Sequence, residues 1–194
     1  MTQTKIIIAG IGGQGVVYLT QLLCEAAVIA DIPVATSEIH GLSQRSSSVI
    51  AGITFGENVF GMVEQGGADF LLALEMLEAQ RCLNYLHRKS IAVIDHTKIF
   101  PHSVNAHKAF YPDTKSFLDF LEQKIGEVIF IKEIPKSIDV ILKNIVVLGR
   151  AAAHKNFPVR PAFIEQAITA LAKDKFAAKT LEVFQDAAGV SGEN

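Results

Sequence analysis

Lys5-Ile-Ile-Ile-Ala9 leads into Gly10-Ile-Gly-Gly-Gln-Gly15 and then into Val16-Val-Tyr-Leu-Thr-Gln-Leu-Leu-Cys-Glu-Ala-Ala27. A short apolar run, a glycine-rich turn and an apolar helical pattern in this order predict a strand, a turn and a helix. We expect Gly10 to permit the tight turn, Gly12 to let the backbone approach a ligand, and Gly15 to let the helix pack on the strand. Unpaired N–H groups at the start of such a helix attract anions. The stretch therefore predicts a cofactor-binding site for a phosphate or another anion, formed by Gly10, Gly12, Gly13, Gln14 and Gly15.

The residues after the glycine turn exclude one class of nucleotide-binding protein. The phosphate loop of ATPases carries Lys and then Ser or Thr after its last glycine, whereas Val16 and Val17 follow Gly15 here. Neither valine reaches a terminal phosphate or holds magnesium, so the chain is not a P-loop ATPase. An ordinary strand-to-helix turn that binds nothing stays open as the alternative.

Composition narrows the class of protein further. The chain has 194 residues, 49% of them hydrophobic, which is enough for a full core in one domain, residues 1–194. With 18 basic and 20 acidic residues and no basic stripe, nucleic acid is not an expected partner. No apolar run approaches the roughly 20 residues that span a bilayer, and the first residues enter a strand at once. We therefore expect no membrane partner and a cytoplasmic location.

The hydrophobic pattern alternates between short apolar runs and helical stretches. Strands are predicted over 34–37, 49–55, 68–74, 91–94 and 127–131, and helices over 75–86 and 138–153. Two more helices follow, the first opened by Pro161. This order predicts an α/β protein with a Rossmann-like, doubly wound, mostly parallel sheet, helices on both faces, and C-terminal helices of about 136–190 packed on it. The pattern lapses over 95–116, which favours a functional or interface loop with a short strand near 109–111.

A second polar stretch, residues 37–48, follows the second predicted strand. Because the carboxyl ends of neighbouring strands face one crevice in a doubly wound sheet, we expect this loop to stand beside the glycine turn. Arg45 would bind a phosphate or carboxylate, Glu38 would accept from a ribose hydroxyl or pair with Arg45, and His40 would change charge near neutral pH. An ion pair between Glu38 and Arg45 with no ligand is the alternative. The candidate residues for a substrate, an anion or a subunit interface are Glu38, His40, Ser43, Gln44 and Arg45.

Other charged residues give weaker signals. Asp95-His96 at a strand end is a candidate catalytic pair, but a turn is the commoner structure for such a sequence. Glu75 and Glu78 share a helix face, where a solvated or capping role is expected. The histidines lack metal-ligand spacing, so no metal site is predicted.

The glycine turn followed by Glu38-Ile-His-Gly-Leu-Ser-Gln-Arg45 resembles one family. It is similar to the small subunit, beta or gamma, of 2-oxoacid:ferredoxin oxidoreductases, above all to the beta subunit of indolepyruvate:ferredoxin oxidoreductase and the related gamma subunit of the pyruvate enzyme. The resemblance continues through nearly the whole chain, in Ala68-Asp-Phe-Leu-Leu-Ala-Leu-Glu75 with Glu78-Ala79, in Tyr111-Pro112-Asp113 and in Asn144-Ile-Val-Val-Leu-Gly149. One departure is Arg45-Ser46-Ser47, where the family reads Arg-Gly-Gly. Serine adopts left-handed backbone angles less readily than glycine, so the loop is expected to differ there.

The resemblance implies a subunit that is not active alone. Family members decarboxylate a 2-oxoacid on thiamine diphosphate, pass electrons through 4Fe-4S clusters to ferredoxin, and transfer the acyl group to coenzyme A. This chain has two cysteines, Cys24 and Cys82, whereas a cluster needs four thiolates, and it has no motif for thiamine diphosphate with Mg2+. These cofactors are therefore expected on a larger partner subunit, which would contact ferredoxin. This chain would complete the active-site crevice and could receive coenzyme A at the glycine turn; no catalytic residue is assigned to it.

Two other functions remain open. In a free-standing NAD(P)-binding reductase, Glu38 would accept the ribose hydroxyls, although no clear Tyr/Lys or His/Asp catalytic pair can be placed in the rest of the chain. In a nucleotide-sensing module, the apolar helix around 141–148 would form a homodimer in the isolated protein. Indolepyruvate, or another aryl pyruvate, as substrate is implied by the resemblance alone.

Overall fold

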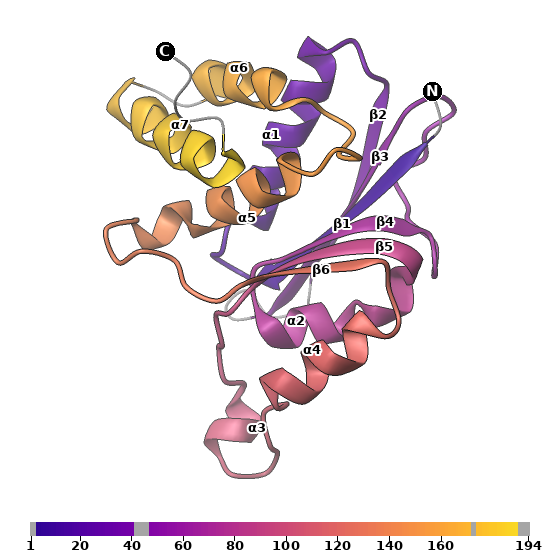
Figure 1. Ribbon diagram of the computed structural model, residues 1–194, viewed down its shortest axis with the longest axis vertical. Helices are drawn as coiled ribbons and strands as arrows, with labels where there is room; N and C mark the ends of the chain where they lie inside the picture. The colour runs from indigo at the N-terminus through magenta and orange to yellow at the C-terminus, as the bar shows by residue number, and fades with distance from the viewer. Residues whose placement is uncertain (1–2, 41–46, 172–173, 190–194) are drawn as a thin grey trace.

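In the computed structural model, which describes residues 3–40, 47–171 and 174–189, one six-stranded sheet forms the centre of the molecule (Figure 1). The strands lie side by side in the order β2-β3-β1-β4-β5-β6. Their bounds are β1 Thr4–Ile11, β2 Val34–His40, β3 Ser48–Phe55, β4 Ala68–Ala73, β5 Leu86–Asp95 and β6 Glu127–Ile131. The strand order leaves β1 in the middle, with the turn that follows it at the carboxyl end of the sheet.

The prediction of a mostly parallel sheet is confirmed, with β3 as the exception. Strands β1, β4, β5 and β6 pair in parallel, whereas β3 lies antiparallel between β2 and β1. A parallel connection needs a crossover of a dozen or more residues. Only residues 41–47 join β2 to β3, so the chain must return antiparallel to the strand it has just left.

Helices cover both faces of the sheet, as predicted (Figure 1). On one face lie α1 (Val16–Ile29), α5 (Lys143–Ala152), α6 (Pro161–Leu171) and α7 (Asp174–Ala188), and on the other lie α2 (Met76–Arg81) and α4 (Thr114–Glu122). Helix α5 packs on β4 and β5, and α6 packs on α1. The short helix α3 (His102–Asn105) lies apart from both layers. The C-terminal helices therefore belong to the layer that holds α1.

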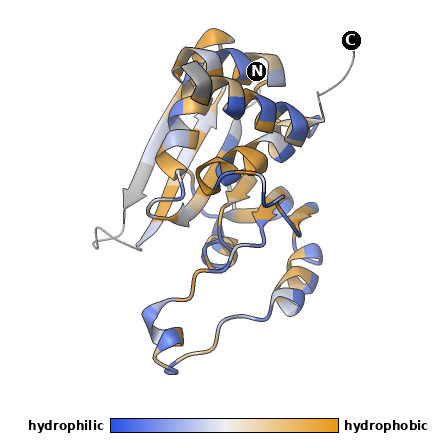
Figure 2. Cartoon of the chain, turned by 90° about the vertical axis from the view of Figure 1, so that its left-hand side faces the viewer, coloured by the Kyte–Doolittle hydropathy of each residue, from blue (hydrophilic) through white to orange (hydrophobic). Residues whose placement is uncertain are grey.

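The alternation of side chains along β1 divides the core into two parts. Ile6 and Ile8 pack with α1 and the C-terminal helices, whereas Ile7 and Ala9 pack with α2 and α4. Successive residues of a strand point to opposite faces, and a strand buried on both faces is apolar throughout. Figure 2 shows the apolar residues gathered along the sheet and along the helix faces that meet it. The near-continuous apolar run at the start of the sequence is thus explained by burial on both sides.

Two of the predicted helices have wrong bounds, and one predicted strand is absent. The helix predicted over 75–86 ends at Arg81, and a 3-10 turn, η1 (Leu83–Tyr85), leads directly into β5. The helix predicted over 138–153 begins at Lys143, after a second 3-10 turn, η2 (Val140–Leu142), whose start is capped by the Asp139 side chain. Residues 109–111 form no strand, and α3 (His102–Asn105) lies earlier in the 95–116 segment. In both helices a local cap or tight turn overrides the hydrophobic period.

Candidate functional site

The glycine turn joins β1 to α1, and its glycines have separate roles. Gly10 lies within β1, where a Cβ would come within 3.0 Å of Val16 Cγ2, so Gly10 permits close packing and does not form the turn as predicted. Gly13 and Gly15 have φ of 95° and 85°, which only glycine adopts readily. Gly15 caps α1, and a Cβ there would lie 2.3 Å from Asn144 Nδ2. Gly15 therefore makes room for α5, not for the strand that was expected.

Several donors in the turn are already used by the protein. The Gly12 N–H donates to the Ser47 carbonyl at 3.0 Å, and the Gln14 N–H donates to the Ile11 carbonyl at 3.0 Å. The Gln14 side chain accepts from the Ile11 N–H at 2.7 Å and donates to the Leu74 carbonyl at 2.8 Å. Gln14 thus ties the turn to the end of β4. Within the described part of the chain, the N–H groups of Gly13 and Gly15 have no hydrogen-bond partner, so they remain available to a ligand together with the first N–H groups of α1.

A cavity of about 160 Å³ opens beside the turn. It lies where the starts of α1 and α5 converge on the ends of β4 and β5. Its lining residues are Gly13, Gln14, Leu74, Asp95, Thr97, Ile99, Val140, Ile141, Lys143 and Asn144. Each helix start carries a partial positive charge, and the Lys143 ammonium adds a full one. The positive side of this cavity therefore suits a phosphate or a carboxylate.

Two buried polar side chains line the same cavity. Asn144 is 4% exposed, and its Oδ1 has no hydrogen-bond partner among the described residues. Asp95 is buried at the end of β5, where its Oδ2 accepts from the Thr97 hydroxyl at 2.6 Å and its Oδ1 lies 3.0 Å from His96 Nδ1. An unpartnered buried acceptor is costly, and a ligand N–H or O–H would satisfy it. The cavity thus offers donors for an anion at the turn and acceptors further inside.

Part of the polar stretch over 37–48 lies beside the glycine turn. The backbone of His40 pairs with Val49, which in turn pairs with Gly10, and Ser48 pairs with Ile11. The expected neighbourhood of this stretch and the turn is therefore present for the backbone at the C-terminal end of the stretch, where Ser47 and Ser48 adjoin the turn, whereas β3 separates the start of the stretch in β2 from β1. Glu38 and His40 belong to β2, not to a loop, because the strand runs three residues further than predicted. Ser43, Gln44 and Arg45 lie outside the described residues, so their role in binding stays a prediction, as does the role of the glycines.

Glu75 has a structural role that the sequence only half indicated. Its carboxylate is fully buried, so the solvated role is wrong, while the capping role is confirmed. Oε2 accepts from the N–H groups of Leu77 and Glu78 at the start of α2. Oε1 accepts from the Ile99 N–H at 2.9 Å and from the Tyr111 hydroxyl. One carboxylate thereby fastens both ends of the segment between β5 and α4 to α2.

Glu78 is also buried. It accepts from Arg81 Nη1 at 2.5 Å and from the Ser48 hydroxyl at the start of β3. Because Ser48 lies next to the glycine turn, Glu78 holds β3 in place there. The sequence signal for Glu75 was its position just after a buried strand, and that for Glu78 was its place in the first turn of the helix that follows.

We expect the contact between Tyr111 and Glu75 to make the protein lose stability in alkali. Burial, together with the hydrogen bond to Glu75, raises the pKa of Tyr111 above its ordinary value of 10.0. The folded protein therefore retains this proton to higher pH than the unfolded chain, so the stabilisation is intact below pH 10 and is lost as the pH rises above it. Urea unfolding can be measured at about pH 8 and about pH 11, which bracket the ordinary tyrosine pKa of about 10. Between these two pH values the free energy of unfolding should fall more for the wild type than for Tyr111→Phe. Equal losses would contradict this account.

Fold and site together define an α/β protein whose first strand-to-helix turn forms one wall of a partly polar cavity. The family model described as pyruvate ferredoxin/flavodoxin oxidoreductase matches residues 5–190, and the chain belongs to this family. Within the described residues, no helix is long and apolar enough to cross a membrane.

Curated relatives match most of the chain. Indolepyruvate oxidoreductase subunit IorB of Thermococcus kodakarensis is 34% identical over 173 residues, which cover 87% of this chain and 86% of the relative. The subunit of the same name from Archaeoglobus fulgidus is 32% identical over 174 residues, with 88% and 87% covered. That of Methanothermobacter thermautotrophicus is 32% identical over 193 residues, which cover 98% of each chain.

Solved structures share the fold. The gamma subunit of a keto/oxoacid ferredoxin oxidoreductase from Geobacter sulfurreducens has a TM-score of 0.67 at 20% identity, with 97% of this chain and 99% of that chain covered. A pyruvate oxidoreductase subunit from Thermotoga maritima has a TM-score of 0.71 at 16% identity, with 97% of both chains covered. In the 2-oxoglutarate:ferredoxin oxidoreductase of Magnetococcus marinus, solved with 2-oxoglutarate, coenzyme A and succinyl-CoA bound, the match has a TM-score of 0.70 at 16% identity and covers 100% of this chain but 32% of the longer one.

Proposed function

We propose that this chain is the small, IorB-type subunit of a cytoplasmic 2-oxoacid:ferredoxin oxidoreductase that acts on indolepyruvate or another aryl pyruvate. The observation that carries the proposal is the match of nearly the whole chain to three IorB subunits at 32–34% identity. We also propose that residues 1–194 act as one domain, because α5 and α6 pack on the sheet and on α1.

The chemistry of the chain agrees with a dependent subunit. Two cysteines cannot supply four thiolates, and no group of three or more metal-ligating side chains exists in the described ranges. We assign thiamine diphosphate, Mg2+ and the 4Fe-4S clusters to the larger subunit, where thiamine diphosphate would supply the decarboxylation chemistry. Ferredoxin would receive electrons from that subunit.

We assign to the cavity the binding of an anionic group of coenzyme A. The Gly13 N–H and the Lys143 ammonium, which both line the cavity, fit a phosphate, and Asn144 Oδ1 fits an N–H or O–H donor. Pockets that hold a whole small molecule measure about 300–1,000 Å³. A cavity of about 160 Å³ therefore receives only part of such a ligand, and the remainder must be bound by another surface.

The proposal is tested by isolating the larger partner subunit together with this chain. We expect anaerobic affinity purification of the tagged chain from its native cells to bring down a larger chain with iron and thiamine diphosphate. That complex should reduce ferredoxin with an aryl pyruvate and coenzyme A, and neither subunit should do so alone. Recovery of the small chain alone, together with NADH binding followed by fluorescence, would contradict the proposal and favour the free-standing reductase.

Loss of the Lys143 charge should weaken binding of coenzyme A. A charge-assisted hydrogen bond is worth about 1.5–3 kcal/mol, so Lys143→Gln should raise the KM for coenzyme A roughly tenfold or more and leave kcat unchanged. Steady-state kinetics of the reconstituted complex measure both values. Lys136→Gln, at an exposed lysine outside the cavity lining, is the matched control and should leave the KM unchanged. An unchanged KM in Lys143→Gln would remove Lys143 from the site.

A further inference from the structure

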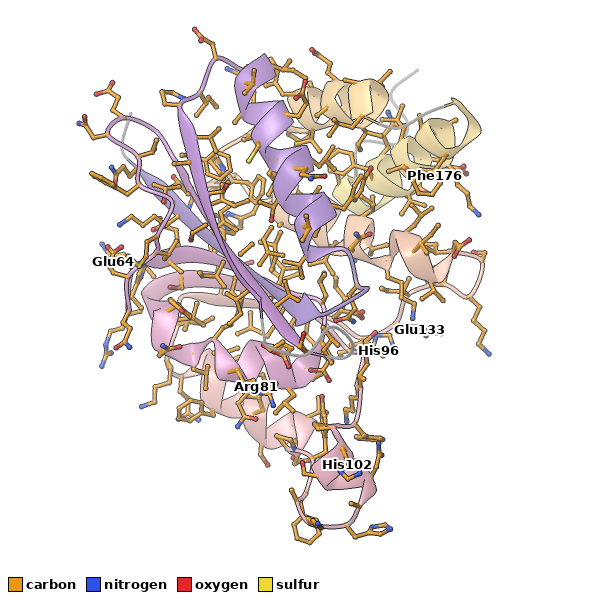
Figure 3. The ribbon with its side chains drawn as sticks, turned by 180° about the vertical axis from the view of Figure 1, so that it is seen from behind. Glu64, Arg81, His96, His102, Glu133 and Phe176 are labelled. Atoms are coloured by element: carbon orange, nitrogen blue, oxygen red, sulfur yellow. The ribbon has the colours of Figure 1, made fainter. Side chains whose placement is uncertain are left out.

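Residues 98–111, here called the arm, project away from both helical layers (Figures 1 and 3). His96 lies just before the arm and His102 lies on α3 within it. The base of the arm is held firmly, because Glu75 accepts hydrogen bonds from Ile99 at one end and Tyr111 at the other. The Phe100 ring also packs edge-on against Tyr111, with centroids 5.1 Å apart. The arm is therefore anchored to α2 at its base while its far part stands free of the body.

The arm presents an aromatic side chain that the chain itself does not cover. Phe110 is 100% exposed, next to the ring pair at the base of the arm. Aromatic side chains that are exposed in a free subunit and buried in a complex commonly carry much of the binding energy. A fully exposed phenylalanine on an anchored projection is thus suited to insertion into a pocket of another protein.

The apolar surface continues from the arm to the mouth of the cavity. Ile99 at the base of the arm lines the cavity, as do Val140 and Ile141 on its opposite side. Val140 is 75% exposed and Ile141 is 60% exposed. An exposed apolar rim around a polar cavity indicates a surface that a partner covers.

The charge of the arm defines the chemistry of the partner. From His96 to Pro112 the sequence contains Lys98 and Lys108 and three histidines, but no Asp or Glu. Both lysines are exposed, and Lys143 stands at the cavity. A second copy of this chain would bring like charges together, which opposes pairing through the arm. The surface that fits is an apolar pocket with carboxylates around it.

We propose that the arm, with Phe110 as its anchor, docks into an apolar, acid-rimmed pocket of the larger thiamine diphosphate and iron–sulfur subunit, and that docking closes the cavity. This inference rests on the proposed function, since that function supplies the larger subunit. The partner covers Ile99, Val140 and Ile141, and the ligand is then enclosed between the two chains.

The test measures the affinity of the purified larger subunit for variants of the full-length chain. Phe110→Ser should weaken binding roughly tenfold or more, as expected for an aromatic anchor. Lys108→Glu should weaken it more at low salt than at high salt. Phe60→Ser is the matched control, because Phe60 is 77% exposed and follows β3 at the opposite edge of the sheet. This variant should bind within about twofold of the wild type, the range of a contact that carries little energy.

The outcomes distinguish a failure of the docking role from a failure of the proposed function. Wild-type affinity in Phe110→Ser, or equal weakening in Phe60→Ser, would overturn the docking role while leaving the proposed function intact. A homodimer of the isolated chain that Phe110→Ser dissociates, seen by analytical ultracentrifugation, would also overturn it. If the wild type does not bind the larger subunit at all, the proposed function itself fails. Equal unfolding midpoints for wild type and both phenylalanine variants show that any difference is one of binding.

Discussion

Glu75→Ala should destabilise the protein by about 3–5 kcal/mol, because it leaves buried donors without an acceptor. The carboxylate accepts from the N–H groups of Leu77, Glu78 and Ile99 and from the Tyr111 hydroxyl, and it is fully buried. Urea unfolding at neutral pH measures the change. The loss is large because one side chain caps α2 and holds both ends of the arm.

A second measurement checks that Glu75 holds the base of the arm in place. Limited trypsin digestion should cut Glu75→Ala faster at Lys98 and Lys108, both exposed, than it cuts the wild type. Glu122→Ala on α4 is the matched control, since Glu122 is exposed, and it should stay within about 0.5 kcal/mol of the wild type. If Glu75→Ala lowers the free energy of unfolding by less than about 1 kcal/mol, the size of one ordinary hydrogen bond, the hydrogen bonds to the Glu75 carboxylate contribute little to stability.

Gly15→Ala should be the more damaging of two substitutions in the glycine turn. Gly13 and Gly15 both have positive φ, so an alanine at either position costs about 1–3 kcal/mol of backbone strain. At Gly13 the new Cβ meets no heavy atom within 4 Å, whereas at Gly15 it would lie 2.3 Å from Asn144 Nδ2. Gly15→Ala should therefore lose about 2 kcal/mol more than Gly13→Ala, which is the range of overpacking in a core.

The double variant Gly15→Ala, Asn144→Ala separates strain from crowding. Removal of the Asn144 amide frees the space, so the double variant should lose less than the sum of the two single variants. Thermal and urea unfolding of all four proteins give the coupling. Simple additivity would show that the contact between the turn and α5 does not determine the cost.

The features that were predicted from the sequence are those with a local signal. The strand, turn and helix at the start follow from an apolar run, glycines and a helical period, and all three are present. The sheet was predicted to be mostly parallel because helices separate most of its strands. The antiparallel β3 was missed because its direction depends on the length of the connection from β2, not on the residues of the strand.

The site was predicted in part, and the missing part has a physical explanation. Gly13 and Gly15 were identified from their motif, but Asn144, which fills the space beside Gly15, lies 129 residues further along the chain. No periodic pattern links residues at that separation. Glu75 resembled a solvated helix residue, because a carboxylate that caps a helix and one that faces water differ only in what the rest of the fold places beside them.

The position of Asn144 against the glycine turn makes the cavity a junction between two segments that lie 129 residues apart in the chain. A ligand bound there would contact the first turn of the sheet and the start of α5 at once, and would act as a reversible cross-link across a loop that contains most of the chain. Such a ligand must raise the melting temperature, and above its Kd the stabilisation grows with the logarithm of the ligand concentration. Thermal shift in the presence of small phosphorylated compounds therefore offers a screen for the ligand that requires neither the partner nor turnover.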